Sequence, residues 1–183
     1  MGRLIVSANM TTDMVIDPLE GWFQPNLGMA DGLAQLIAAD ALILGRKTYK
    51  KLADFWPKSD DEWAELINPM PKHVASRTLE GPLTWNSQLL GADIAGEVAN
   101  LKSRYSGDLI LYGIGELANY LARQDLVDEV RFWVHPVIWG DGVRPFHAGE
   151  LPIRLHLISA TTYASGMVRL AYRPTAYLTT AAD

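Results

Sequence analysis

The sequence predicts an α/β protein with a mixed, mostly parallel central sheet, flanking helices and a C-terminal antiparallel hairpin. Short apolar runs alternate with longer segments of helical periodicity, which is the pattern of proteins built around parallel sheets. The last part of the chain differs, because two extended segments, 153–163 and 167–173, flank Ala164-Ser165-Gly166. Small and polar residues between two extended segments favour a hairpin turn.

The spacing of apolar residues predicts the individual elements. Buried strands are expected at residues 4–8, 41–44, 72–76, 83–85, 109–112 and 130–138. Helical faces predict helices around Met29–Ile37, Arg46–Leu52, Trp63–Ile67, Ile94–Tyr105 and Leu117–Leu121. Ser59-Asp60-Asp61-Glu62 has the spacing of a capping box and predicts where the third of these helices begins. A long loop is expected over residues 17–27.

The composition is that of an ordinary globular protein of 183 residues, 49% of them hydrophobic, with no cysteine. At this length we expect one domain over residues 1–174 and a tail at 175–183. Sixteen Lys and Arg against 21 Asp and Glu give a net charge of −5, which disfavours a nucleic-acid partner. No apolar run approaches the ~20 residues of a membrane span, and no secretory signal is evident. We therefore expect no membrane partner, and a reducing cytoplasm is compatible with the sequence.

Ligands of open α/β sheets bind beyond the carboxyl ends of the strands, and two expected strand ends carry cations and hydroxyls. Gly45-Arg46-Lys47-Thr48 combines a turn glycine, a helix N-terminus, two cations and a hydroxyl, which suits a phosphate. The alternative is a turn followed by a solvated helix face. Ser76-Arg77-Thr78 flanks a guanidinium with two hydroxyls and can bind a phosphate dianion bidentately, although ordinary polar loops have the same composition.

A third strand end carries a glycine turn. Gly113-Ile114-Gly115-Glu116-Leu117-Ala118 matches the pattern G-x-G-x-x-A. A Rossmann dinucleotide fold does not fit, because no acidic residue ends the next expected strand and because the motif lies late in the chain. A glycine turn at a helix N-terminus can still hold a pyrophosphate.

Three segments together carry a family resemblance. They are Ala41-Leu42-Ile43-Leu44-Gly45-Arg46-Lys47-Thr48-Tyr49, Met70-Pro71-Lys72-His73-Val74-Ala75-Ser76-Arg77-Thr78-Leu79, and Leu126-Val127-Asp128-Glu129 continuing through His135-Pro136-Val137-Ile138-Trp139-Gly140-Asp141-Gly142 to Phe146. In this order and spacing, the chain resembles the dihydrofolate-reductase-like proteins related to the C-terminal reductase domain of the bifunctional riboflavin-biosynthesis deaminase/reductase. The resemblance implies a dihydrofolate-reductase-like fold, homodimers and an NADPH-dependent reductase activity.

The resemblance also implies roles for single residues. The cofactor phosphate would be held by Gly45, Arg46, Lys47 and Thr48, and the adenosine 2′-phosphate by Ser76, Arg77 and Thr78. The pyrophosphate turn would comprise Tyr112, Gly113, Ile114, Gly115, Glu116 and Leu117, and the nicotinamide edge Ala8, Ile16 and Asp17. Dihydrofolate reductases place a Gly-Gly pair with a cis peptide at the third strand end, whereas Ile114 follows Gly113 here. A cis bond before a residue other than proline costs about 2.5 to 4 kcal/mol. Glu116 likewise stands where a cation would suit phosphate better.

Four further residues are candidates for contact with a substrate. Trp22, Phe23 and Trp56 lie in expected loops and could wall an aromatic ring, the alternative being ordinary packing. Asp31, near the start of a helix, is our candidate for the proton that must accompany hydride transfer to a C=N or C=O bond. In the alternative interpretation Asp31 only complements the helix dipole, and Asp13, Asp17 or water supplies the proton.

Other chemistries find no support in the sequence. His73, His135, His147 and His156 lack metal-ligand spacing, so no metal site is expected, and no G-x-S-x-G nucleophile elbow occurs. The apolar run Val130–Trp139 needs cover on both faces, either from helices or from a second copy, and we expect a homodimer. The leading hypothesis is an NADPH-dependent reductase of a small molecule, with a riboflavin-pathway pyrimidine, a pterin and an unrelated carbonyl all open. The alternative is a non-catalytic nucleotide-binding or regulatory protein on the same fold.

Overall fold

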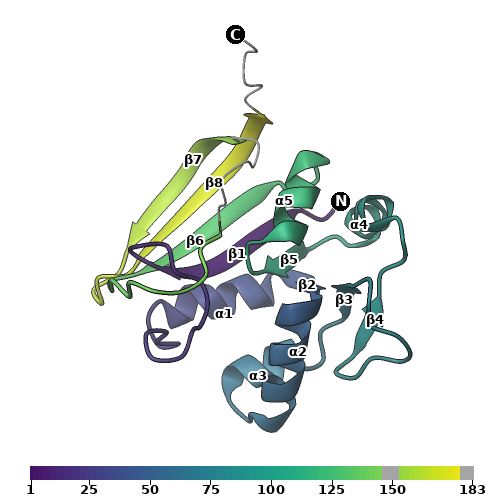
Figure 1. Ribbon diagram of the computed structural model, residues 1–183, viewed down its shortest axis with the longest axis horizontal. Helices are drawn as coiled ribbons and strands as arrows, with labels where there is room; N and C mark the ends of the chain where they lie inside the picture. Colours follow the sequence, from purple (N-terminus) through teal and green to yellow (C-terminus); the bar gives the residue numbers. More distant parts are fainter. Residues whose placement is uncertain (146–152, 178–183) are drawn as a thin grey trace. The chain divides into compact units, whose positions relative to one another are not determined.

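The computed structural model of the protein describes residues 1–145 and 153–177 (Figure 1). Its strands are β1 (Leu4–Thr11), β2 (Ala39–Gly45), β3 (Lys72–Ala75), β4 (Ser87–Leu89), β5 (Asp108–Tyr112), β6 (Glu129–His135), β7 (Ile153–Thr162) and β8 (Val168–Tyr177). Its helices are α1 (Met29–Ile37), α2 (Arg46–Phe55), the 3₁₀ turn η1 (Trp56–Lys58), α3 (Glu62–Ile67), α4 (Ile94–Arg104) and α5 (Glu116–Arg123). The strand order β4-β3-β2-β5-β1-β6-β8-β7 confirms the predicted mixed sheet with a C-terminal hairpin.

Two compact units make up the chain. Unit 1 comprises Met1–Ile5 and Met29–Gly113, and unit 2 comprises Val6–Gly28 and the described residues that follow Gly113. Strand β1 therefore begins in unit 1 and continues in unit 2. Residues 146–152 and 178–183 lie outside the described residues, which places Phe146, His147 and most of the expected tail beyond the description of either unit.

Unit 1 is a parallel α/β layer. Strand β2 pairs in parallel with β3 on one side and β5 on the other, and β3 pairs in parallel with β4. Its core is a cluster of buried side chains from the sheet and the helices, namely Ile5, Leu36, Leu42, Leu44, Tyr49, Ile67, Met70, Val74 and Ile110. Fully burying an aliphatic side chain of this kind contributes about 1.5 to 3 kcal/mol, so this cluster is a main source of the unit's stability.

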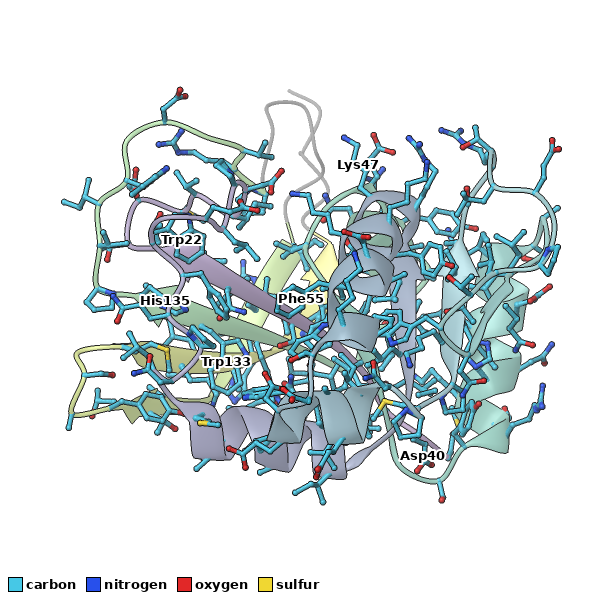
Figure 2. The ribbon with its side chains drawn as sticks, turned by 90° about the horizontal axis from the view of Figure 1, so that it is seen from below. Trp22, Asp40, Lys47, Phe55, Trp133 and His135 are labelled. Carbon is cyan, nitrogen blue, oxygen red and sulfur yellow. The ribbon has the colours of Figure 1, made fainter. Side chains whose placement is uncertain are left out.

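A carboxylate joins the starts of β2 and β5, two neighbouring parallel strands of unit 1. The side chain of Asp40, at the start of β2 and labelled in Figure 2, accepts hydrogen bonds from two backbone N–H groups, that of Ser106 at 3.1 Å and that of Gly107 at 2.6 Å. A Cβ at Gly107 would lie 2.7 Å from the Asp40 carboxylate, so only glycine allows this approach. The contact holds the turn that precedes β5 against the start of β2.

Two local expectations for unit 1 are wrong. The predicted strand over residues 83–85 does not form, because Trp85 and Asn86 have positive φ angles of 60° and 48°, which an extended strand excludes, and β4 begins only at Ser87. The cap of α3 is Asp61, whose carboxylate accepts the Ala64 N–H at 2.8 Å, and not Ser59. The apolar residues around 83–85 instead pack against the core of unit 1.

Unit 2 contains the antiparallel part of the sheet. Strand β8 pairs with β6 on one side and with β7 on the other, and β7 and β8 run side by side as a long hairpin (Figure 1). Gly166, at φ +85°, lies in the predicted turn, which the hydrogen bond from Tyr163 N–H to the Met167 carbonyl closes at 3.0 Å. The hairpin is therefore confirmed.

Strand β6 is shorter than predicted and is covered within the chain. It ends at His135 instead of residue 138, because Pro136 has no N–H to donate and the N–H of Val137 turns back to the His135 carbonyl at 2.8 Å. Phe132 and Trp133 are buried, whereas Ile138 and Trp139, beyond the strand, are exposed. The run Val130–Trp139 is thus not one two-faced strand. Among residues 1–145 and 153–177, no helix has the length and apolar character needed to cross a membrane.

Candidate functional site

The register of unit 1 aligns the carboxyl ends of three neighbouring strands. Gly45 at the end of β2 pairs with Ala75 at the end of β3, and Leu44 pairs with Tyr112 at the end of β5. The residues that follow these ends are Arg46, Ser76 and Gly113. The structure therefore brings together the three candidate phosphate-binding segments that the sequence places far apart.

The first of these segments begins α2. Gly45 is the N-cap residue, with φ −75° and ψ 157°, and no side chain caps the helix. Arg46 and Lys47 are exposed on the first turn, and Thr48 is half-buried; Lys47 is labelled in Figure 2. Backbone N–H groups at a helix N-terminus and two cations favour a bound anion here.

The second segment is a hydroxyl-stabilised turn after β3. The Oγ of Ser76 accepts the backbone N–H groups of Thr78 at 3.1 Å and of Leu79 at 3.0 Å. Arg77 and Thr78 are exposed. The turn thus presents the guanidinium of Arg77 to solvent from an ordered backbone.

The third segment turns at Gly113, whose φ of +89° favours glycine. A Cβ at this position would lie 3.4 Å from the Thr48 Oγ1. The Gly113-Ile114 peptide is trans, unlike the cis Gly-Gly peptide that dihydrofolate reductases have at this strand end. Among the described residues, the cis peptide bond is Asp17-Pro18. The chain continues in unit 2, where Gly115 is the N-cap of α5 and Glu116 and Leu117 lie in its first turn; Ile114 is buried and Glu116 is exposed.

Tyr112 and Asp31 occupy different environments within unit 1. Burial raises the pKa of the Tyr112 hydroxyl to about 12, against the opposing effect of a hydrogen bond with Gln35. The phenol therefore keeps its proton at neutral pH. Asp31 lies in the first turn of α1 and is half-buried. The next residue, Gly32, packs so closely on the indole of Trp63 that a Cβ would overlap the ring.

The nicotinamide-edge candidates Ala8, Ile16 and Asp17 belong to unit 2. Ala8 is buried in β1, and the other two follow that strand in a loop. The backbone N–H of Ile16 donates to the carbonyl of Val143 at 2.8 Å, and the N–H of Val143 donates to the carbonyl of Asp17 at 2.8 Å. Backbone pairing with a distant segment of the chain therefore fixes the loop.

Trp22 and Phe23 pack around His135 in unit 2, as Figure 2 shows for Trp22. The ring centroid of His135 lies 5.3 Å from that of Trp22 and 5.4 Å from that of Phe23. His135 Nε2 hydrogen-bonds to Asn9 Oδ1 at 3.1 Å, its Nδ1 is buried without a hydrogen-bond partner, and burial lowers the pKa of its imidazole. The spacing of residues in the sequence does not reveal that His135 is the centre of this aromatic cluster, because Asn9, Trp22 and Phe23 lie more than a hundred positions away along the chain.

The third aromatic candidate, Trp56, packs against the core of unit 1. Its neighbour Phe55 lies 5.0 Å away, edge to face, and is 58% exposed (Figure 2). Phe55 is not among the sequence candidates, because the last residue of an amphipathic helix gives no local signal of exposure. Of these two rings, Phe55 is the one open to solvent.

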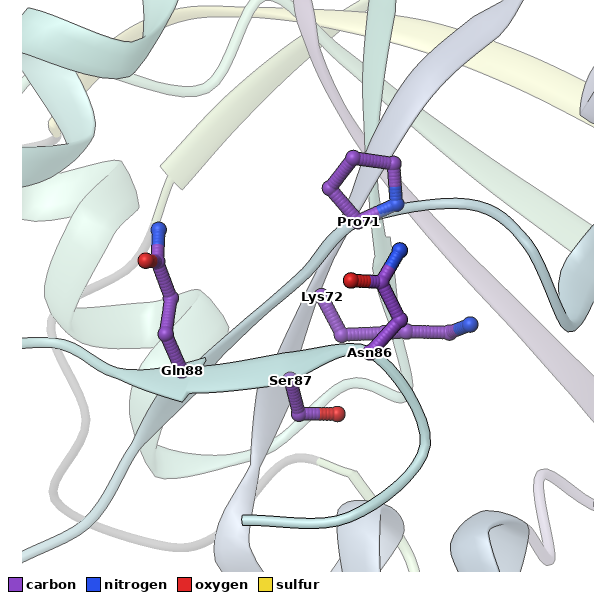
Figure 3. Close-up of a pocket in the computed structure, with 5 residues that line it drawn as sticks. All are labelled: Pro71, Lys72, Asn86, Ser87 and Gln88. Atoms are coloured by element: carbon purple, nitrogen blue, oxygen red, sulfur yellow. The ribbon is translucent and has the colours of Figure 1, made fainter. Parts of the chain in front are cut away.

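Two small polar pockets lie along β3 and β4 in unit 1. One, of about 160 Å³, is lined by Pro71, Lys72, Asn86, Ser87 and Gln88 (Figure 3). The other, of about 270 Å³, is lined by His73, Gln88, Glu97, Asn100, Leu101 and Arg104.

His73, which lines the second pocket, has a shifted pKa. Burial and the charge of Arg104 lower the pKa of its imidazole, and the charge of Glu97 acts in the opposite direction. Both His73 nitrogens have partners, Tyr105 and Gln88. Within the described residues, no group of three metal-ligating side chains occurs.

Comparison with known proteins identifies relatives over nearly the whole chain. An uncharacterized protein, YyaP, of Bacillus subtilis (strain 168) is 30% identical over 180 residues, which is 93% of this chain and 94% of that protein. A putative riboflavin biosynthesis protein from Shewanella sp. PV-4 has a similar structure, with a TM-score of 0.75, 22% identity, and coverage of 95% of this chain and 99% of that one.

Dihydrofolate reductase from Enterococcus faecalis, complexed with NADP(H) and RAB-propyl, shares the fold with a TM-score of 0.64 at 13% identity, covering 96% of this chain and 98% of that one. The family described as the RibD C-terminal domain matches residues 28–169, which include all three aligned strand ends. The resemblance expected from the sequence is thereby confirmed, and the chain belongs to the RibD C-terminal domain family.

Proposed function

We propose that the protein is an NADPH-dependent reductase that transfers hydride to a small heterocyclic or carbonyl substrate of the riboflavin-pathway or pterin type. The observation that carries the proposal is the alignment of three strand ends in unit 1, each followed by groups suited to phosphate. Two further findings support the proposal. The chain belongs to the RibD C-terminal domain family, and it shares its fold with a dihydrofolate reductase complexed with NADP(H).

The residues present fit the phosphates of NADPH. Arg46 and Lys47 stand at an uncapped helix N-terminus and would bind one phosphate, while the ordered turn at Ser76 presents Arg77 to the 2′-phosphate. The sharp turn at Gly113 would admit the pyrophosphate close to the backbone. When bound, NADPH supplies the hydride; the protein supplies orientation and charge.

Unit 2 holds the residues that the sequence assigns to the nicotinamide edge, and two of the aromatic candidates for substrate contact. Ile16 and Asp17, on a loop fixed by backbone pairing with Val143, would border the nicotinamide ring. Phe23, half-buried beside His135, would contact a flat substrate, whereas Trp22 is 4% exposed and would shape this wall from behind. Asp31 of unit 1 would be the proton source, directly or through water.

Cofactor titration tests the proposal. NADPH should bind more tightly than NADH, because a charge-assisted bond to the 2′-phosphate contributes roughly 1.5 to 3 kcal/mol. Arg77→Ala should remove most of this preference, while Arg123→Ala, which changes an exposed arginine in the last turn of α5, should leave it intact. Equal affinities for the two cofactors, or a preference indifferent to Arg77→Ala, would contradict the assignment.

Turnover separates a reductase from a non-catalytic nucleotide-binding protein. A thermal-shift screen with pyrimidines, pterins and carbonyl compounds comes first, since a ligand at 100 times its Kd stabilises by about 2.7 kcal/mol. Consumption of NADPH in the presence of a hit then measures the reaction. NADPH binding without consumption by any compound of these classes would favour the non-catalytic alternative.

We also infer a homodimer, now from a different surface. With β6 covered within its own chain, exposed apolar side chains occur instead on β7, at Leu155, Leu157 and Ile158. β7 ends the order of the described strands, so one of its edges pairs with none of them, which favours association. Light scattering at micromolar concentration measures the mass, and a monomer mass would reject the inference.

A further inference from the structure

We propose that Asp13 is a positioning residue that holds segment 11–17 against segment 137–144 and thereby fixes Ile16 and Asp17. The proposal rests on the proposed function, which assigns these two residues to the nicotinamide edge. All of the residues concerned belong to unit 2.

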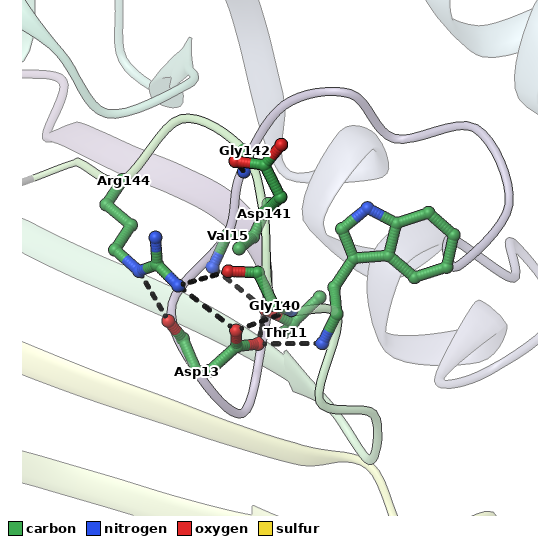
Figure 4. Close-up of polar contacts among 8 residues, drawn as sticks. Thr11, Asp13, Val15, Gly140, Asp141, Gly142 and Arg144 are labelled. Carbon is green, nitrogen blue, oxygen red and sulfur yellow. Dashed lines mark hydrogen bonds and ion pairs between the residues drawn. The ribbon is translucent and has the colours of Figure 1, made fainter.

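The carboxylate of Asp13 is surrounded by hydrogen-bond donors (Figure 4). Its Oδ1 accepts the Thr11 hydroxyl at 2.7 Å and the backbone N–H of Trp139 at 3.0 Å. Its Oδ2 accepts the backbone N–H of Gly140 at 2.9 Å and the Nη2 of Arg144 at 3.2 Å. Both oxygens are therefore used twice, and we call these five residues the Asp13 cluster.

Arg144 strengthens the cluster by binding both segments. Its Nε donates to the backbone carbonyl of Asp13 at 3.1 Å, and its Nη2 also donates to the carbonyl of Gly140 at 3.0 Å. The rigid guanidinium fork thus joins residues 131 positions apart in the sequence. The Thr11 hydroxyl and the backbone N–H groups of Trp139 and Gly140 hold the pKa of Asp13 well below its usual value, so the carboxylate stays charged at neutral pH.

Backbone pairing extends the contact between the segments on both sides of Asp13. The N–H of Thr12 donates to the Val137 carbonyl at 2.9 Å, and Val143 pairs with Ile16 and Asp17 as described above. Gly142 permits the approach, because a Cβ there would lie 2.5 Å from Val15 Cγ1 and 2.7 Å from the Asp17 carbonyl. The segment that bears Ile16 and Asp17 is therefore fixed by contacts of which Asp13 supplies the charged centre.

Loss of the Asp13 carboxylate removes the acceptors of two backbone N–H groups and the charged partner of Arg144, which keeps its bonds to the backbone carbonyls of Asp13 and Gly140. Backbone pairing and the Arg144 bond to the Asp13 carbonyl then remain as the polar contacts named above between segments 137–144 and 11–17, and the loop bearing Ile16 and Asp17 gains freedom. The phosphate-binding candidates of unit 1 belong to other segments. We therefore expect the nicotinamide ring of bound NADPH to become more mobile, while the affinity for the cofactor phosphates stays unchanged.

Three measurements on Asp13→Asn test the proposal in the full-length chain. Asparagine keeps the size of the side chain, but its amide nitrogen cannot accept a hydrogen bond. Amide hydrogen exchange in segments 11–17 and 137–144 should accelerate by about tenfold or more. The Kd for NADPH should change less than about threefold, while the emission anisotropy of bound NADPH should fall towards the free value, because ring order and phosphate affinity arise from different contacts.

Two further variants complete the test. Arg144→Gln should reproduce the Asp13→Asn effects in part, and Asp54→Asn, which breaks the exposed Asp54–Lys58 ion pair, should reproduce none of them. Unchanged exchange in Asp13→Asn, or faster exchange with unchanged anisotropy of bound NADPH, overturns the positioning role. Failure of the unmodified protein to bind NADPH overturns the proposed function, and the positioning role with it, before any variant is made. Faster exchange and lower anisotropy at constant NADPH affinity support the proposal.

Discussion

The hydroxyl oxygen of Thr48 lies 3.4 Å from the point at which the Cβ of a side chain on Gly113 would stand. The two residues follow neighbouring strands, and the close approach leaves the third strand end as bare backbone beside a hydroxyl at the first turn of α2. A pyrophosphate site needs this combination of accessible backbone and donor groups.

Gly113→Ala should therefore weaken both folding and cofactor binding. An alanine at φ +89° is strained by about 1 to 3 kcal/mol, and relief of that strain moves the turn. Urea denaturation measures the first effect and NADPH titration the second. Gly45→Ala is the matched stability control, since Gly45 has φ −75° and a Cβ there would meet no atom within 4 Å. Equal stability of the two variants would contradict the prediction.

Ser76→Ala should reduce the preference for NADPH over NADH. The variant loses the two backbone hydrogen bonds that order the turn before Arg77, each worth about 0.5 to 1.5 kcal/mol, and a disordered turn presents the guanidinium less often. Cofactor titrations give the ratio of affinities. Ser103→Ala serves as control because that hydroxyl bonds to its own helix backbone in α4, at the Ala99 carbonyl. A preference equal to that of the unmodified protein would show that the turn does not need its hydroxyl.

Asp31→Asn should lower kcat with a confirmed substrate while leaving NADPH affinity unchanged. The variant keeps the shape of the side chain in the first turn of α1 and removes the group that can carry the proton. Steady-state kinetics and a cofactor titration on the same preparation separate the two effects. Turnover equal to that of the unmodified protein would shift the role to Asp13, to Asp17 or to water.

Lys72 should make folding stability rise with pH in the alkaline range. Its side chain is buried, donates to the carbonyls of Ile67 and Asn68, and lies over the Trp85 ring. Burial lowers its pKa from 10.5 to about 8. Between these values the unfolded chain holds the proton while the folded protein releases it, so stability increases with pH. The neutral amine still has N–H groups for both carbonyls.

Lys72→Met isolates this contribution. Its stability should be lower than that of the unmodified protein at pH 7, because two carbonyls lose their donor, and the deficit should widen from pH 8 to pH 10. Urea denaturation across this range measures the difference, with Lys50→Met, an exposed position on α2, as control. A deficit that stays constant or shrinks would show that the folded protein does not release the Lys72 proton in this window.

Much of the fold could be predicted because its signals are local. Apolar runs such as Ala41–Leu44 and the turn at Gly166 are sufficient to predict a strand and a hairpin. The errors have local causes too, but ones that residue type hides. Trp85 and Asn86 adopt positive φ angles, which their residue types do not predict. Leu83 and Trp85 therefore pack against the core without forming a strand.

The candidate site was predictable to a different extent in the two units. The three candidate phosphate-binding segments each have a recognisable composition. The parallel register of β2, β3 and β5 is sufficient to bring Arg46, Ser76 and Gly113 to the same edge of the sheet in unit 1. In unit 2 the informative contacts join residues more than a hundred positions apart, as in the pairs Asn9 and His135 and Asp13 and Arg144. No local spacing in the sequence encodes such pairs.

The division of β1 between the two units has a consequence for synthesis on the ribosome. Unit 1 comes almost wholly from one continuous stretch, Met29–Gly113, whereas unit 2 must unite Val6–Gly28 with residues translated after Gly113. Ser7, whose hydroxyl accepts the indole N–H of Trp133, is translated 126 residues before that partner. Until β6 is translated, one edge of β1 therefore lacks its neighbouring strand, and we expect the nascent chain to be most prone to aggregation during this period.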